Sequence, residues 1–244
     1  MGEKIIYEVL RVIEGKPIFL ENHFKRMKNS FELIDEKVTL IYGDISNKVY
    51  ELIKNENKLE GNIKITYEVY SKTLKIFFIE HSYPSAEMYE NGVKTILYFG
   101  ERENPNAKIV NENFREKINK EIKDNNAYEA ILVDSNGYIT EGSRSNIFMV
   151  KGNRLLTSPV KAVLPGITRQ EIIKLAEKLK IEVEEVEYKY LDINKLDGMF
   201  ISGTSPKVLP IKSINDINLD PNAGIIRKLM IEYDNKVNQY IKSH

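Results

Sequence analysis

Lys108 is the first residue in the chain whose type and position suggest covalent chemistry. It follows a Pro- and Asn-rich loop and stands at the expected start of a helix, in the run Ala107-Lys108-Ile109-Val110-Asn111. The positive end of a helix dipole disfavours a nearby ammonium and so favours the nucleophilic amine form. We therefore expect a reactive amine at Lys108. Lysines are abundant here, however, so position alone does not separate it from an ordinary surface lysine.

Three further segments are polar, contain glycine and interrupt apolar runs. Glu141, in the Thr140–Asn146 segment, supplies a carboxylate that suits a cationic ring nitrogen. Leu164–Arg169 leads straight into a helix with Thr168 at its start, an arrangement that binds phosphate, or else one in which the threonine caps the helix. Ile201–Pro206 combines small hydroxyl residues with a glycine, as anion-binding turns do. Read alone, the segment with Glu141 is more often an ordinary loop than a functional one, and the other two segments are about evenly balanced between the two readings.

The order of these segments resembles the class IV aminotransferase family, the type IV fold of pyridoxal-phosphate enzymes. Members include branched-chain and D-amino-acid aminotransferases and aminodeoxychorismate lyase. The matching runs are His23-Phe24-Lys25-Arg26, Ala107–Asn111, Tyr128–Leu132 with Gly137–Gly142, Leu164–Arg169 and Ser202–Ser205. The resemblance covers essentially the whole chain.

The resemblance implies a role for each matched residue. Lys108 is the catalytic residue and holds pyridoxal 5′-phosphate covalently, and Glu141 faces the pyridine nitrogen. The cofactor phosphate is expected to bind Arg26, the backbone amides of Ile167 and Thr168, and Thr204. Substrate is expected near Tyr7 and at Thr204 and Ser205, whose amides suit its α-carboxylate. No metal is expected, since the three histidines have no metal-ligand spacing.

The favoured activity is transfer of an amino group from an L-amino acid, of branched-chain type, to a 2-oxo acid. Aminodeoxychorismate lyase is the first alternative, because both reactions begin with deprotonation of the same carbon. A protein that binds the cofactor with little or no turnover is the second. Tyr67–Ser71 stands where D-amino-acid enzymes have an Arg-x-His pair, so that activity is not expected.

The fold implied by the resemblance is α+β with two domains. Residues 1–83 form a small mixed α/β domain, shortened at its start by comparison with the family pattern, and residues 84–244 form a larger β-barrel-like domain with helices that binds the cofactor. The polar segment 81–86 is the expected linker.

Hydrophobic periodicity predicts the helices that position these residues. Phe24, Met27, Phe31 and Ile34 form one apolar stripe of a helix that opens at residue 21 or 22, and His23, Arg26 and Ser30 lie on another face. Further helices are expected over 44–55, 108–123, 168–180 and 223–242.

The composition of the chain argues against several other classes of function. The 36 basic and 36 acidic residues cancel, and there is no basic stripe, so a nucleic-acid partner is not expected. Without cysteine, the chain has no disulfide, thiolate site or thiol nucleophile. No apolar run approaches the roughly 20 residues that cross a bilayer, and no signal peptide is evident, so no membrane partner and a cytoplasmic location are expected. The family resemblance also implies that the protein is a homodimer.

Overall fold

The computed structural model describes residues 4–244, which divide into two compact units. Unit 1 holds the described residues up to Ser82 together with residues 106–110 and 235–244. Unit 2 holds residues 83–105 and 111–234. The first change of unit thus falls inside the polar segment 81–86. Residues 106–110, which carry Lys108, lie in unit 1 and not in the unit formed by most of the later chain.

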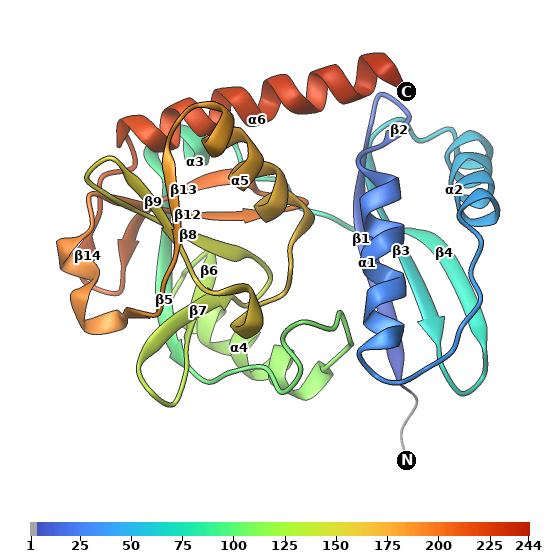
Figure 1. Cartoon of the computed structure of the whole chain (residues 1–244), viewed down its shortest axis with the longest axis horizontal. Coiled ribbons are helices and arrows are strands. Elements are labelled where there is room, and N and C mark those ends of the chain that lie inside the picture. The colour runs from blue at the N-terminus through green and yellow to red at the C-terminus, as the bar shows by residue number, and fades with distance from the viewer. Residues whose placement is uncertain (1–3) are drawn as a thin grey trace. The chain divides into compact units, whose positions relative to one another are not determined.

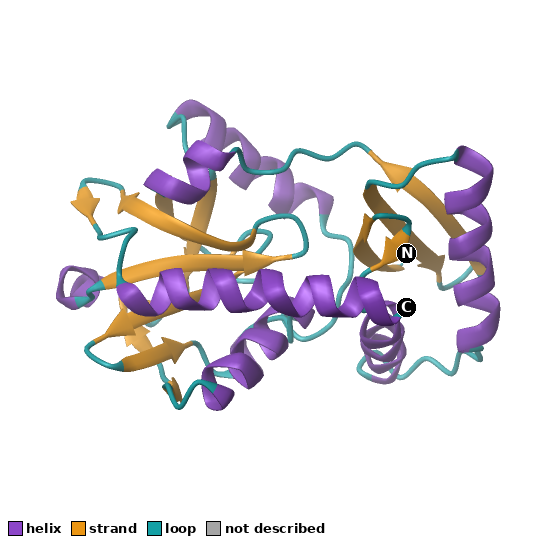
Figure 2. Cartoon of the chain, turned by 90° about the horizontal axis from the view of Figure 1, so that it is seen from above, coloured by secondary structure: helices purple, strands orange, loops and turns teal. Residues whose placement is uncertain are grey.

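Unit 1 is a layer of helices on an antiparallel sheet of strand order β2-β1-β3-β4 (Figure 1). The strands are β1 (Ile5–Ile13), β2 (Lys16–Pro17), β3 (Gly61–Glu68) and β4 (Thr73–Ile79). Helices α1 (Leu20–Glu32) and α2 (Tyr42–Glu56) lie beside each other over this sheet (Figures 1 and 2).

The sequence of β1 explains how unit 1 is built. Its side chains alternate between buried and half-buried, as a strand with one covered face requires. The buried set is Ile6, Glu8, Leu10 and Val12. The three apolar members pack with Leu20, Met27 and Phe31 of α1 in one core, and Glu8 is the single charged residue of the buried set.

Unit 2 is built on one large mixed sheet of strand order β10-β9-β8-β12-β13-β5-β6-β7-β11, with β14 on β13. Its strands are β5 (Val93–Phe99), β6 (Glu129–Val133), β7 (Tyr138–Gly142), β8 (Asn146–Lys151), β9 (Arg154–Thr157), β10 (Glu182–Glu185), β11 (Tyr188–Lys189), β12 (Gly198–Gly203), β13 (Lys207–Ile214) and β14 (Ile217–Asn218). Consecutive β7 and β8 contact each other although they are not neighbours in this order, so the sheet curves toward a barrel. The α+β fold is confirmed.

Helices cover the sheet of unit 2. They are α3 (Ala86–Asn91), α4 (Glu112–Asp124), the 3-10 turns η1 (Val160–Ala162) and η2 (Tyr190–Lys195), α5 (Ile167–Lys178) and α6 (Gly224–Ser243), whose last residues belong to unit 1. Strands β6 and β12 are buried along almost their whole length and are correspondingly apolar.

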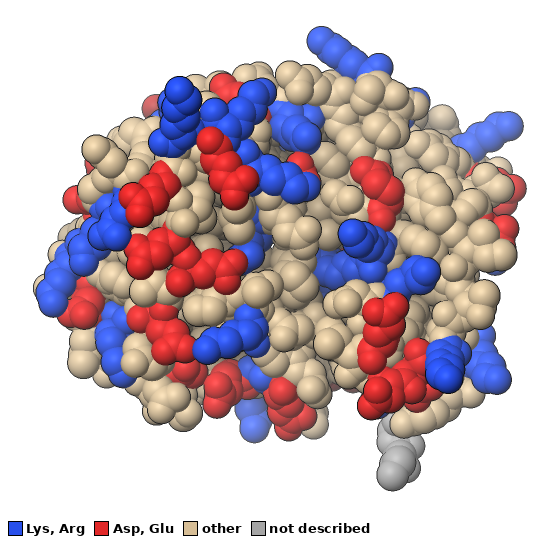
Figure 3. Space-filling view, viewed as in Figure 1, with Lys and Arg blue, Asp and Glu red and all other residues tan. Residues whose placement is uncertain are grey.

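Charged side chains of both signs occur on the face that Figure 3 draws. On the face drawn in Figure 3, acidic and basic side chains are interleaved. Among residues 4–244, no helix combines the length and apolar character needed to cross a bilayer.

Candidate active site

Lys108 lies on a segment that runs along the free edge of β1. The Tyr7 amide donates to the Lys108 carbonyl at 3.0 Å, and the Val110 amide donates to the Ile5 carbonyl at 3.1 Å. These bonds extend the sheet of unit 1 by one short edge segment, so the position of Lys108 is set by the strand beside it. Its Nζ lies 4.6 Å from the centre of the Tyr7 ring. Two of the predicted residues are thereby brought together, with a cation–π contact between them.

The expectation that a helix starts at Lys108 is wrong. Helix α4 begins at Glu112, and the Asn111 side chain caps it by accepting the Phe114 amide at 3.2 Å. Asparagine is among the strongest N-cap residues, because its side chain satisfies an amide that the helix leaves unpaired. Lys108 stands three residues before the cap with its backbone bonded to β1, so the helix dipole gives no argument for its reactivity.

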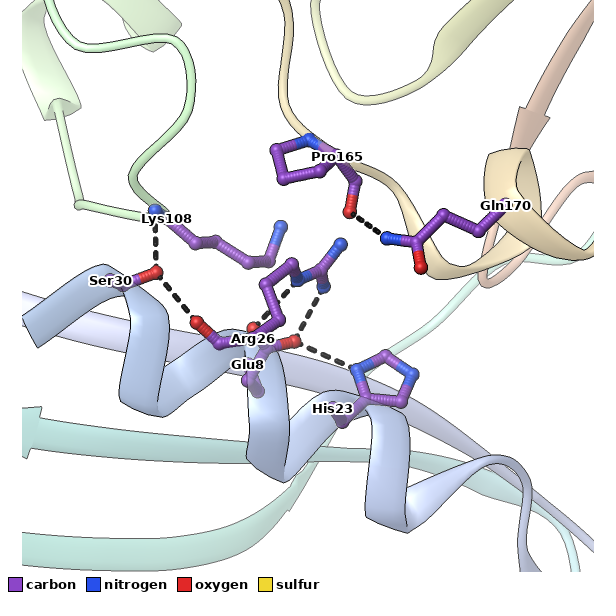
Figure 4. A network of polar contacts seen from close by, with 7 residues as sticks. All are labelled: Glu8, His23, Arg26, Ser30, Lys108, Pro165 and Gln170. Atoms are coloured by element: carbon purple, nitrogen blue, oxygen red, sulfur yellow. Dashed lines mark hydrogen bonds and ion pairs between the residues drawn. The ribbon is translucent and has the colours of Figure 1, made fainter. Parts of the chain in front are cut away.

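Arg26 lies in a buried polar network on α1. Its Nε donates to Oε1 of Glu8 at 2.9 Å, and its Nη2 donates to Oε2 at 2.5 Å (Figure 4). Nδ1 of His23, one turn earlier on the same helix face, lies 2.7 Å from the same Oε2. Glu8 is fully buried, and His23 and Arg26 are nearly so. The predicted His-x-x-Arg pair is therefore joined through a third residue from β1.

The electrostatics of this network favour a carboxylate and a neutral imidazole. Burial by itself would raise the pKa of Glu8, but the charge and hydrogen bonds of Arg26, with the hydrogen bond of His23, hold that pKa at about 2. Burial lowers the pKa of His23 below its ordinary value, although the Glu8 carboxylate opposes the shift. At neutral pH a neutral His23 then donates from Nδ1 to Glu8.

Ser30 connects this network to Lys108. Its fully buried hydroxyl donates to the Arg26 carbonyl at 3.1 Å and accepts the Lys108 amide at 3.3 Å. Arg26, Ser30 and Lys108 are therefore successive members of one hydrogen-bonded chain (Figure 4). The sequence places Ser30 on the Arg26 face of the helix but gives it no function.

Glu141 is a buried carboxylate near the end of β7. Its Oε2 accepts the Leu164 amide at 3.0 Å, and Nη1 of Arg102 donates to its Oε1 at 3.2 Å. The Arg102 side chain keeps 19% of its surface exposed, whereas that of Glu141 keeps 4%. Sequence reasoning missed Arg102, which lies in an irregular loop and carries no local pattern.

Glu129 holds the loop that follows Glu141. Its carboxylate accepts the Ser143 hydroxyl at 2.5 Å, the Arg144 amide at 3.2 Å and the Ser145 hydroxyl at 3.0 Å. Sequence reasoning missed this residue too. The available signal was an acidic residue at the head of a wholly apolar strand, where an unpaired charge is costly.

The start of α5 has no side-chain cap. Gly166 occupies the N-cap position, and Ile167 and Thr168 are the first two helical residues. The Thr168 hydroxyl lies 3.3 Å from the Tyr233 hydroxyl, so it does not serve as the cap. The capping alternative is therefore not what the structure shows. First-turn amides without a side-chain cap are suited to an anion.

Gly166 is required by close packing. A Cβ atom there would lie 2.0 Å from Oδ1 of Asn146, whose Nδ2 donates to the Leu164 carbonyl at 2.8 Å. The Gly166 φ of −61° is accessible to any residue, so the constraint is steric and not conformational. The turn before α5 is thus held against β8 by backbone approach.

Thr204 and Ser205 form the turn between β12 and β13 and are half-buried. Ser202, two residues before Thr204, is almost fully buried, and its hydroxyl has no hydrogen-bond partner among residues 4–244. Buried hydroxyls without partners are uncommon and mark places where a further polar group is expected. The observation agrees with a polar ligand near this turn.

The predicted residues are divided between the units. Tyr7, Arg26 and Lys108 lie in unit 1; Glu141, Ile167, Thr168, Thr204 and Ser205 lie in unit 2. Unit 1 thus offers an amine and a guanidinium. Unit 2 offers a carboxylate, an uncapped helix start and small hydroxyls. These donors and acceptors fit an aldehyde, a phosphate and a cationic ring nitrogen, the three reactive or charged parts of pyridoxal phosphate.

Comparison with known proteins gives a consistent assignment. The family model for class IV amino-transferases matches residues 5–214. A Thermotoga maritima protein described as a probable branched-chain-amino-acid aminotransferase is 31% identical over 214 residues, which cover 86% of this chain and 77% of that protein.

Solved structures share the fold. The Escherichia coli branched-chain amino acid aminotransferase matches with a TM-score of 0.86 at 24% identity, over 96% of this chain and 86% of that one. A Legionella pneumophila structure, provisionally assigned as a 4-amino-4-deoxychorismate lyase, matches with a TM-score of 0.86 at 22% identity, over 95% and 90%. At these identities the two structures inform on fold alone.

Proposed function

Because the chain belongs to the class IV aminotransferase family, we propose that it is a pyridoxal-phosphate-dependent aminotransferase that moves an amino group from an L-amino acid of branched-chain type to a 2-oxo acid. The observation that carries the cofactor assignment lies within unit 2. A buried carboxylate, Glu141, is joined by the Leu164 amide to the segment that leads into the uncapped start of α5. One unit thus couples a partner for a ring cation to a partner for a phosphate.

Bound pyridoxal phosphate supplies an electron sink for the charge that develops at the substrate α-carbon. Lys108 would hold the cofactor covalently, and its amine would move a proton between the substrate α-carbon and the cofactor. Glu141 keeps the ring nitrogen protonated, which makes the ring a better acceptor of electrons. Arg102 donates a charge-assisted hydrogen bond to the other oxygen of Glu141 and so orients that carboxylate.

The phosphate is bound by charge and by backbone amides. Arg26 supplies charge-assisted hydrogen bonds, and Ile167 and Thr168 supply first-turn amides of α5. Thr204 adds a hydroxyl, and the amides of Thr204 and Ser205 meet the substrate carboxylate. Tyr7, whose ring faces the Lys108 amine, lines the substrate side.

The preference for a branched-chain substrate is supported by the Thermotoga maritima relative. Two assays separate it from the lyase alternative. Purified protein with L-leucine and 2-oxoglutarate should yield L-glutamate, and p-aminobenzoate release from aminodeoxychorismate should stay at background. The reverse pattern would assign the lyase reaction. Inactivity in both, with cofactor bound, would favour a binding protein.

The cofactor itself is tested more directly. Protein incubated with pyridoxal phosphate and desalted should retain a visible absorption band, and Lys108→Ala should lack that band while keeping the wild-type thermal unfolding temperature without cofactor. Lys64→Ala is the matched control, because Lys64 also lies over the Tyr7 ring, at 5.3 Å, and has no covalent role here. Failure of the wild type to retain any cofactor would exclude the proposed function.

Homodimerisation and a cytoplasmic location are further proposals, supported by the family resemblance and by the sequence. Light scattering on the purified protein tests the first. A mass of one chain, 28.3 kDa, at micromolar concentration would contradict it.

A further inference from the structure

Three buried polar residues, His23, Arg26 and Ser30, line one face of α1. Their spacing of three and four residues places them along a single helical ridge. Each is less than one-tenth exposed. Only Arg26 has a role in the proposed reaction. Glu8, His23 and Ser30 are buried polar groups that this role does not explain.

An apolar contact could fill the same place between helix and strand. Elsewhere on the same face of β1, Ile6, Leu10 and Val12 meet α1 and α2 through apolar side chains. Burying a carboxylate at Glu8 costs solvation energy, which a paired guanidinium offsets only with good geometry. The network is therefore better suited to fixing side-chain positions than to stabilising unit 1.

The geometry at Glu8 fixes the plane of the Arg26 guanidinium. Two donors of Arg26 bind the two oxygens of one carboxylate, at 2.9 and 2.5 Å. Such a two-point contact removes rotation that a single bond would allow. His23, bound to Oε2 at 2.7 Å, prevents the carboxylate from turning in its place.

Ser30 fixes the other end of the chain of contacts. Its hydroxyl accepts the Lys108 backbone amide and is bonded to the carbonyl of Arg26 as well. The backbone of Lys108 is thereby tied to the helix turn that carries Arg26. A shift of the 106–110 segment along β1 would break this contact.

We propose that Glu8 and Ser30 are positioning residues that hold Arg26 and Lys108 at a set spacing, matched to the phosphate and the aldehyde of one cofactor molecule. The inference rests on the proposed function. Glu8 acts on the phosphate end, through the orientation of Arg26. Ser30 acts on the aldehyde end, through the backbone of Lys108. Neither residue touches the reacting atoms.

The role of Glu8 at the phosphate end and that of Ser30 at the aldehyde end can be told apart by comparing the binding of pyridoxal phosphate with that of pyridoxal, which lacks the phosphate. Both are titrated against wild type, Glu8→Gln and Ser30→Ala, and the dissociation constants are taken from the absorption of the lysine-bound form. Glu8→Gln should raise the dissociation constant of pyridoxal phosphate about tenfold, as expected for loss of a charge-assisted contact. It should leave the dissociation constant of pyridoxal within about twofold of the wild-type value. Ser30→Ala should weaken both by the same factor, so that their ratio stays as in the wild type.

Matched controls test for a general loss of structure. Glu184→Gln removes a carboxylate that binds the exposed Arg154 at 2.8 Å, and Ser158→Ala removes a buried serine hydroxyl that donates to the Ile139 carbonyl at 2.8 Å. Both should leave the two dissociation constants unchanged. Should Glu8→Gln fail to fold, His23→Gln takes its place, because it removes one restraint on Glu8 and keeps the ion pair. It should lower the preference for the phosphate by a smaller factor.

The outcomes distinguish a positioning role from a purely structural one. If Glu8→Gln, or His23→Gln in its place, weakens both ligands equally, Glu8 has a structural role alone and the inference is wrong. If Ser30→Ala changes neither ligand, the link to Lys108 has no positioning role. If the wild type takes up neither ligand, the proposed function fails first. If the wild type binds both ligands and the ratio of the two dissociation constants is the same in Glu8→Gln, only the inference about Glu8 is wrong.

Discussion

One buried carboxylate in unit 1, Glu8, and one in unit 2, Glu141, are held by different means. In unit 1, Glu8 is bound by side chains, Arg26 and His23, and is fully enclosed. In unit 2, Glu141 is bound by a backbone amide of Leu164 and by the partly exposed Arg102. The position of Glu8 therefore depends on the charges of particular side chains. The position of Glu141 depends in part on where the backbone of Leu164 lies.

Two glycines close to Glu141 in the sequence or in its contacts also depend on backbone position. Two glycines of unit 2 allow an approach that a methyl group would block, since a Cβ at Gly142 would lie 2.1 Å from the Ser145 hydroxyl and one at Gly166 would lie 2.0 Å from Asn146. In α2 of unit 1, Gly43 has open space around its Cβ position. We therefore expect the Glu8 network of unit 1 to be damaged mainly by removing charge, and the turns at Gly142 and Gly166 of unit 2 mainly by adding volume.

Removing the charge of Arg26 should have the largest effect. Arg26→Leu leaves the carboxylate of Glu8 buried without its main partner, and loss of one partner of a buried pair costs about 3–5 kcal/mol in the free energy of unfolding. Urea unfolding measures it. Arg154→Leu, which breaks the exposed pair with Glu184, should cost under about 1 kcal/mol. Equal losses in the two variants would contradict the comparison.

The stability of the folded protein at low pH should depend on the same network of Glu8, Arg26 and His23. The pKa of Glu8 in the folded protein is about 2, below its ordinary 4.5, so its contribution is complete above about pH 4.5 and is lost as the pH falls toward 2. The shift corresponds to about 3 kcal/mol. The lowered pKa of His23 acts in the same direction below pH 6.5.

The wild-type melting temperature should therefore fall more steeply with acid than that of Glu8→Gln, between pH 4.5 and the acid limit of folding. Parallel curves for the two proteins would show that Glu8 does not carry this dependence.

Adding a methyl group at Gly166 should have an intermediate effect, in unit 2. Gly166→Ala forces the Asn146 side chain or the turn to move. This should lower the free energy of unfolding by about 1–3 kcal/mol, as is usual for overpacking. It should also weaken pyridoxal phosphate binding, because the first turn of α5 shifts. Thermal unfolding and cofactor titration measure both. Gly43→Ala is the control and should stabilise slightly, since alanine is the better helix former.

Removing one hydroxyl in unit 2 should have the smallest effect. Tyr233→Phe deletes the contact with the Thr168 hydroxyl, which is worth about 0.5–1.5 kcal/mol in the free energy of unfolding. Since the cofactor phosphate is proposed to use the amides of α5, its affinity should change less than in Gly166→Ala. A larger change in Tyr233→Phe would assign the phosphate contact chiefly to the Thr168 hydroxyl.

Elements with strong periodicity were predicted well. The apolar stripes around Met27 and Ile172 led to helices that the structure places at Leu20–Glu32 and Ile167–Lys178. Such stripes reflect burial of one helix face, which a local pattern records directly. The expected helix at Lys108 failed because its start was decided by a side-chain cap at Asn111 and by pairing of residues 106–110 with β1. Only the cap is a local signal.

Residue types and their order were enough to predict the family and the α+β class, because these depend on local patterns that survive in a linear chain. The roles assigned to the site residues stay predictions. The partners of those members depended on the tertiary structure. Glu8 reaches Arg26 across 18 positions, and Ser30 reaches Lys108 across 78. A hydrogen bond requires two groups within about 3 Å. The packing of α1 on β1, together with the pairing of residues 106–110 with β1, brings such distant residues that close.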